Sequence, residues 1–240
     1  MLLPIQDENP TYSKPVVTVA LLSANVLVFL YQFMLGPVGE QLFIFKTAAV
    51  PYELTHFVDR TSIAISNTQY VYPEGFFPFP LTLLTAMFTH GGYMHLGGNM
   101  LYLWIFGNNI EDAMGHGRFF LFYMLTGLGA TLVHVLSDPD STIPMIGASG
   151  AIAGVLGAYF VLYPKAKIKT FVVLIVFIQI IHVPAILILG FWFLRQIIGI
   201  GSDGIAWYAH IGGFIVGMFL VRRFARTRSR PMIIDPSGEW

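Results

Sequence analysis

Residues 145–160 read "MIGASGAIAGVLGAYF", an apolar stretch that starts with a serine between glycines. Gly150, Gly154 and Gly157 recur every three or four residues, so they share one face of a helix. Small residues let helix backbones approach each other closely in lipid. The stretch therefore predicts a tightly packed membrane helix with Ser149 at its N-terminal end.

The composition of the whole chain agrees with a membrane protein. Of its 240 residues 55% are hydrophobic and only 11% are charged, and the mean hydropathy is +0.69. A soluble domain of this length is far less apolar. The chain has no cysteine, which excludes disulfides, thiolate metal sites and a cysteine nucleophile.

Windows of roughly 20 apolar residues mark membrane-spanning helices, because that length crosses about 30 Å of hydrocarbon. The sequence contains six such windows, at residues 16–35, 94–111, 118–137, 147–163, 182–200 and 204–221. They predict an all-α polytopic membrane protein with a six-transmembrane-helix bundle. The fifth window is ambiguous, because residues 168–201 are apolar for longer than one crossing needs. Pro184 suits a first helical turn, so we expect "IKTFVVLIVFIQI", residues 168–180, to lie partly in the cytoplasmic interface.

The lysines and arginines predict the orientation of these spans. With six spans and an inner N-terminus, ten of the 13 basic residues lie inside and three lie outside, at Lys46, Arg60 and Arg195. The predicted organisation is a cytoplasmic N-terminal segment (1–15), a membrane domain (16–221) with a long outer loop (36–93), and a basic cytoplasmic tail (222–240). Prolines in the loop argue against another span, and its many aromatics suit the headgroup level. The arginines of the tail indicate a stop-transfer signal rather than a nucleic-acid site.

Polar residues of three spans fall at one predicted depth. The second, fourth and sixth spans all enter from the outer side, with His95 and Asn99 four residues apart on one face of the second. Ser149 starts the fourth span, and His210 lies about two turns into the sixth, roughly 10 Å below its start. Polar groups are costly in lipid and usually mark function there.

Glycines would let the fourth and sixth spans touch. Gly213 and Gly217 share a face with His210 and could pack on the glycine stripe that follows Ser149. Such a seam would bring Ser149 and His210 within hydrogen-bond reach, as a nucleophile and its base. Gly147 and Gly150 permit an open approach to a serine at a helix N-terminus, where unpaired N–H groups suit an oxyanion. Taken singly, each of these residues could serve only in packing.

Three segments, "HLGGNMLYLWIFGNNIED", "GASGAIAGVLGAYF" and "AHIGGFIVG", resemble the signature segments of the rhomboid intramembrane serine proteases. The similarity extends in order from "NPTYSKPVVT" onward. It implies that Ser149 is the nucleophile and His210 the general base of a Ser-His dyad. It also implies that His95 and Asn99 stabilise the oxyanion together with the Ser149 backbone N–H. Many members carry Trp-Arg in the first outer loop, where this chain has Leu81-Thr82.

The resulting expectation is an intramembrane serine endopeptidase that hydrolyses peptide bonds in or near transmembrane helices of other proteins. Its partners would be single-pass membrane proteins and the lipid bilayer, with no cofactor, metal or nucleic acid. We expect a prokaryotic plasma (inner) membrane location with both termini in the cytoplasm. Two alternatives remain: an inactive rhomboid-like protein that binds membrane helices for quality control, and a small transporter. A transporter predicts acidic residues within the spans, whereas Glu111 and Asp112 stand at a helix end. A metalloprotease is disfavoured because the chain has no His-Glu-x-x-His.

Overall fold

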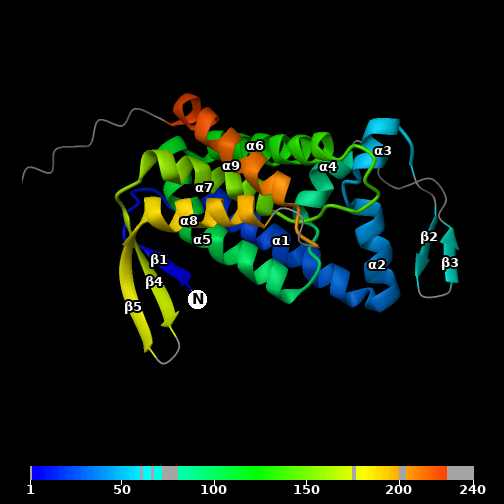
Figure 1. Cartoon of the computed structure of the whole chain (residues 1–240), viewed down its shortest axis with the longest axis horizontal. Coiled ribbons are helices and arrows are strands. Elements are labelled where there is room, and N and C mark those ends of the chain that lie inside the picture. Colours follow the sequence, from blue (N-terminus) through cyan, green and yellow to red (C-terminus); the bar gives the residue numbers. More distant parts are fainter. Residues whose placement is uncertain are drawn as a thin grey trace, which may run out of the picture.

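Six long helices dominate the computed structural model, which describes residues 2–59, 62–65, 68–71, 81–174, 177–199 and 204–225. They run along the long axis of the molecule (Figure 1). Each of the six predicted windows overlaps one of them: α1 (Val16–Met34), α5 (Tyr93–Met114), α6 (His116–Ser137), α7 (Ser149–Leu162), α8 (Ala185–Ile198) and α9 (Trp207–Phe224).

Two of these helices, α1 and α6, are long and apolar enough to cross a membrane, and α7 and α8 are shorter apolar helices. The helices α5 and α9 carry more polar residues. Six membrane crossings therefore stay a prediction, although the helices lie where the sequence places them. Of the predicted tail, Arg222 and Arg223 belong to the last turn of α9, and residues 226–240 lie outside the described part of the chain.

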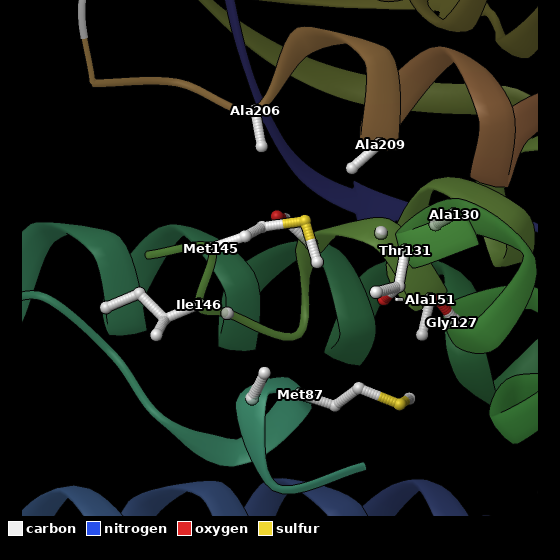
Figure 2. A pocket seen from close by; sticks show the side chains of 13 residues that line it. Met87, Gly127, Ala130, Thr131, Met145, Ile146, Ala151, Ala206 and Ala209 are labelled. Atoms are coloured by element: carbon white, nitrogen blue, oxygen red, sulfur yellow. Dashed lines mark hydrogen bonds between the residues drawn. The ribbon is translucent and has the colours of Figure 1, made fainter. Parts of the chain in front are cut away.

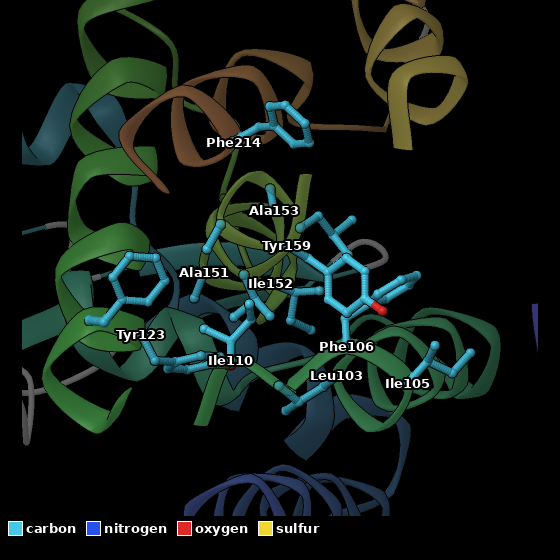
Figure 3. Close-up of a cluster of buried hydrophobic side chains, with 14 of the residues drawn as sticks. Leu103, Ile105, Phe106, Ile110, Tyr123, Ala151, Ile152, Ala153, Tyr159 and Phe214 are labelled. Carbon is cyan, nitrogen blue, oxygen red and sulfur yellow. The ribbon is translucent and has the colours of Figure 1, made fainter. Parts of the chain in front are cut away.

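Helix α7 is the buried centre of the bundle. Its residues from Gly150 to Tyr159 are all buried, and Figure 3 shows Ile152 and Tyr159 among side chains from α5, α6 and α9. Contact with α9 depends on glycine: a Cβ on Gly213 would lie 2.1 Å from the Gly150 carbonyl oxygen, and one on Gly217 would lie 2.1 Å from that of Gly154. The two backbones touch because neither helix has a side chain at these points.

A three-stranded antiparallel sheet corrects the all-α prediction. Strand β1 (Leu2–Asp7) pairs with β4 (Lys167–Leu174), which pairs with β5 (Phe177–Pro184). In β4 the side chains of Ile168 and Thr170 are fully buried and alternate with Lys167 and Lys169, so one face of the strand is covered. The expected interfacial segment therefore includes most of β4 and the first half of β5, and α8 begins directly after Pro184.

The predicted outer loop also contains regular structure. It holds α2 (Gly36–Thr47), α3 (Pro51–His56), the hairpin β2 (Ser62–Ile65) and β3 (Thr68–Val71), α4 (Thr82–Thr85) and the 3₁₀ helix η2 (Ala86–Phe88). Prolines start α2 and α3, where a missing N–H is harmless. These elements lie at the opposite end of the molecule from the three-stranded sheet (Figure 1).

This insertion is joined to the segment that leads into α7. The backbone N–H of Ala49 donates to the carbonyl of Met145 at 3.0 Å, and Met145 returns a bond to Ala49 at 2.8 Å. The N–H of Gly147 donates to the carbonyl of Ala86 at 2.8 Å. The segment's bonding partners Ala49 and Ala86 are buried. The start of α7 is thereby held by backbone hydrogen bonds from two separate parts of the insertion.

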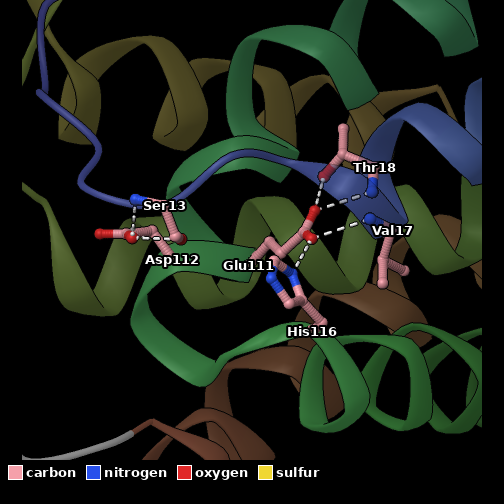
Figure 4. Close-up of polar contacts among 6 residues, drawn as sticks. All are labelled: Ser13, Val17, Thr18, Glu111, Asp112 and His116. Atoms are coloured by element: carbon pink, nitrogen blue, oxygen red, sulfur yellow. Dashed lines mark hydrogen bonds and ion pairs between the residues drawn. The ribbon is translucent and has the colours of Figure 1, made fainter.

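At the other end of the bundle, Glu111 caps the first turn of α1. Its carboxylate accepts the backbone N–H groups of Val17 (2.8 Å) and Thr18 (2.7 Å) and the Thr18 hydroxyl (2.7 Å), with His116 Nδ1 at 2.6 Å (Figure 4). The neighbouring Asp112 accepts the N–H of Ser13 at 2.8 Å. Both carboxylates are buried. Both carboxylates accept hydrogen bonds that link α5 to residues 13–18. This is a structural role, whereas a transporter would need acidic side chains that couple to its substrate.

Candidate active site

The glycine seam is the contact between α7 and α9 at Gly150, Gly154, Gly213 and Gly217. Ser149 and His210 form a hydrogen bond across this seam. Ser149 is the first residue of α7, and its Oγ lies 2.8 Å from Nε2 of His210, which stands one turn into α9. The seam residue Gly213 follows His210 by three positions, so it lies on the same face of α9. The close contact of the two backbones thus sets the distance between the serine and the histidine.

The other ring nitrogen of His210 also has a partner, Gln196 on α8. His210 Nδ1 lies 2.8 Å from Gln196 Oε1, and Gln196 Nε2 donates to the Trp192 carbonyl at 2.9 Å. The sequence analysis missed Gln196. The available signal was an amide side chain inside a mostly apolar window, where polar groups are costly, but nothing in the local sequence indicated that it meets His210.

His95 and Asn99 both reach Gly147, two residues before the serine. A Cβ on Gly147 would lie 2.6 Å from His95 Nε2 and 3.6 Å from Asn99 Nδ2. Gly147 has φ 115°, a conformation that side chains other than glycine's rarely allow. The Asn99 amide nitrogen is buried and has no hydrogen-bond partner among the described residues. It is a free donor beside Gly147, two residues before the serine, and an oxyanion requires such a donor.

A small apolar pocket opens at Ser149 (Figure 2). Met145 and Ile146 line it from the segment before α7, and Met87 lines it from η2. Small residues complete the wall, including Ala130 of α6, Ala209 of α9 and Ala206, which directly precedes α9. The serine hydroxyl therefore faces a wall made mostly of small and apolar side chains.

The remaining predicted site residues serve in packing. Gly150 lies against Ala130, where an added Cβ would be 2.7 Å from the alanine methyl, and Gly154 lies against Thr126. Gly157 meets the backbone of Phe214, whose carbonyl oxygen would lie 2.1 Å from an added Cβ. These contacts fix α7 between α6 and α9, so they position the serine without touching its hydroxyl.

Comparison with known proteins identifies the family of this chain. Residues 80–227 match the model of the Rhomboid domain. The chain is 29% identical to "Rhomboid protein 1, mitochondrial" of Saccharomyces cerevisiae, over 67% of this chain and 47% of that protein. It is 33% identical to "RHOMBOID-like protein 5" of Arabidopsis thaliana, over 58% of this chain and 42% of the relative. It is 37% identical to "Rhomboid protease GluP" of Bacillus subtilis, over 57% of this chain and 24% of the relative.

These relatives limit what the comparison says about the whole protein. The chain spans less than half of the length of each of them. One is named as mitochondrial, one comes from a plant and one from a bacterium, so the relatives do not share one location. The expected prokaryotic plasma membrane is therefore not supported. The match covers more than half of the chain, from α4 through α9, and includes Ser149, His210 and both oxyanion candidates. The chain belongs to the rhomboid family of integral membrane proteins.

Proposed function

We propose that this protein is an intramembrane serine endopeptidase that uses Ser149 and His210 as a catalytic dyad. The observation that carries the proposal is the 2.8 Å contact between Ser149 Oγ and His210 Nε2. A nucleophile and a base within hydrogen-bond reach, brought together from separate helices, are the minimum for covalent acyl transfer. An inactive helix-binding relative would have no need to hold these two groups together.

The site supports each proton transfer of peptide hydrolysis. His210 Nε2 takes the proton of the Ser149 hydroxyl as the oxygen attacks the carbonyl carbon, and it then gives that proton to the leaving amine. Water subsequently attacks the acyl-enzyme with His210 again as the base, which restores the serine. All groups in this sequence belong to the chain, the substrate or water.

The negative charge on the substrate oxygen would be stabilised by donors around Gly147. The buried amide nitrogen of Asn99 is unpaired among the described residues and adjoins Gly147. His95 Nε2 lies against the same glycine. The backbone N–H groups at the start of α7 add the positive end of a helix dipole. Together they surround the position of the oxygen with donors from α5 and α7.

Substrates of this site would be single-pass membrane proteins. We infer that the six long helices cross the bilayer with both termini in the cytoplasm, which places Ser149 near the outer face. A spanning helix keeps its carbonyls in its own hydrogen bonds because lipid offers no other partner. The cleaved segment must therefore unwind, which is easiest near Gly or Pro and near the outer boundary of the membrane.

The test is labelling of the purified protein by a serine-directed fluorophosphonate. The wild-type chain is expected to react, and the variants Ser149→Ala and His210→Ala are expected not to. Ser137→Ala serves as the matched control, because the Ser137 hydroxyl donates to the carbonyl of His134 at the exposed end of α6 and should leave labelling unchanged. Labelling that persists in Ser149→Ala would show that another residue is the nucleophile.

A further inference from the structure

Gln196 contacts His210 from a third helix and is almost fully buried, with 6% of its surface exposed. Its Oε1 lies 2.8 Å from His210 Nδ1, on the side of the ring opposite Ser149. The histidine is therefore bonded at both nitrogens, one to α7 and one to α8. Because the glutamine is shielded from water, solvent does not compete for the bond.

The orientation of the Gln196 amide follows from its second contact. Its nitrogen lies 2.9 Å from the Trp192 carbonyl oxygen, which can only accept a hydrogen bond. The atom facing His210 is therefore the amide oxygen, which also can only accept. It follows that His210 Nδ1 carries the proton.

This proton assignment decides what the other nitrogen can do. In a neutral imidazole one nitrogen donates and the other accepts. With the proton on Nδ1, Nε2 has a free lone pair directed at the Ser149 hydroxyl, as a general base requires. In the opposite tautomer Nε2 would donate to the serine oxygen and could not take its proton.

We propose that Gln196 is a positioning residue that holds His210 in the tautomer and ring orientation needed to activate Ser149. Its importance for turnover rests on the proposed protease function, whereas its effect on the tautomer does not. The ring is further held by Trp192 and Trp207, whose ring centroids lie 6.0 and 6.4 Å from that of His210. Trp192 also provides the carbonyl that orients the amide, so α8 fixes the ring by two contacts.

A glutamine suits this place better than a carboxylate. Burying an ionised side chain within a membrane protein is costly unless it is paired. A neutral amide can accept the Nδ1 proton without that cost, and its NH₂ group finds an acceptor in the same helix. The arrangement thereby provides the orienting acceptor of a triad without a permanent charge.

A purely structural role predicts a different outcome. In that case Gln196 would only join α8 to α9, and its loss would lower stability while leaving the proton on Nδ1. The control for this role is Gln32 of α1, which is also buried and bonds the backbone of His90 through both ends of its amide, at 2.9 and 3.1 Å. Gln32→Met removes a comparable pair of bonds without touching His210.

The experiment compares Gln196→Met, Gln196→Glu and Gln32→Met with the wild type in detergent. Histidine ¹⁵N spectra identify the protonated nitrogen of His210, whose signals are assigned by their loss in His210→Asn. The kcat and KM for a cleaved membrane substrate and the melting temperature are measured on the same samples. Methionine has a similar volume but no strong acceptor, whereas glutamate keeps an acceptor oxygen.

We expect the wild type to hold the proton on Nδ1 and Gln196→Met to show a mixture of both tautomers. The loss of one buried hydrogen bond should lower kcat about tenfold at unchanged KM. Gln196→Glu should restore the Nδ1 proton, and Gln32→Met should change only the melting temperature. A wild-type His210 protonated on Nε2, or an unchanged spectrum and kcat in Gln196→Met, would overturn the proposal. If the wild type does not cleave or label at all, the protease function fails, while the spectra still decide the role of Gln196.

Discussion

The seam between α7 and α9 makes Gly213→Ala a sharp test of how the site is positioned. A Cβ at this position would lie 2.1 Å from the Gly150 carbonyl oxygen. That oxygen belongs to the backbone of α7, so no side chain can rotate to make room. The added methyl group must move the two helices apart, one turn from His210.

The size of this movement follows from the contact distance. Ordinary van der Waals contacts of a Cβ begin at about 3.4 Å, so the methyl group requires the two helices to separate by about 1.3 Å. Added to the present 2.8 Å, this would extend the distance from Ser149 Oγ to His210 Nε2 to about 4 Å, which is too long for a hydrogen bond. Overpacking of this kind costs about 1–3 kcal/mol of stability, and a misplacement of about 1 Å can lower turnover about 100-fold.

The assay measures fluorophosphonate labelling, kcat and the melting temperature on monodisperse protein. Gly117→Ala is the matched control, because Gly117 in the first turn of α6 is exposed and has nothing within 4 Å of an added Cβ. We expect Gly213→Ala to lose about 100-fold in turnover and to melt at a lower temperature, while Gly117→Ala keeps both values. Wild-type turnover in Gly213→Ala would refute the idea that backbone contact along the seam sets the dyad distance.

Three further predictions concern the dyad, the oxyanion donors and the cap of α1. Ser149→Ala and His210→Ala should each abolish cleavage, and the double variant should be no worse, because residues that act as a unit lose activity non-additively; a cleavage assay that finds substantial activity in either single variant contradicts the dyad. Asn99→Ala should lower kcat about 10²–10³-fold at unchanged KM, and an effect on KM alone would indicate packing instead. Glu111→Ala leaves the N–H groups of Val17 and Thr18 without their acceptor, so calorimetry should show a loss of about 1–3 kcal/mol; an unchanged melting profile would mean that water replaces the cap.

Much of the helical framework could be predicted from the sequence because its signals are local. Apolar windows located all six long helices, with the boundaries of α1 and α6 correct to within about two residues. Gly150, Gly154, Gly213 and Gly217 indicated the seam through their spacing alone. These features depend on periodicity within one segment, and such periodicity is visible before the chain folds.

The tertiary structure decided what depends on residues far apart in the chain. An apolar run such as residues 168–174 fits a strand as well as a helix, and only its pairing with β1, which is far away in the chain, and with β5 identifies it as strand β4. Gln196 looked like one polar residue in an apolar window until packing placed it on His210. Composition and spacing thus indicated where the six long helices lie and which residues are candidates for chemistry. Packing alone decided which partners orient those residues, because a hydrogen bond between separate helices leaves no periodic trace in the sequence.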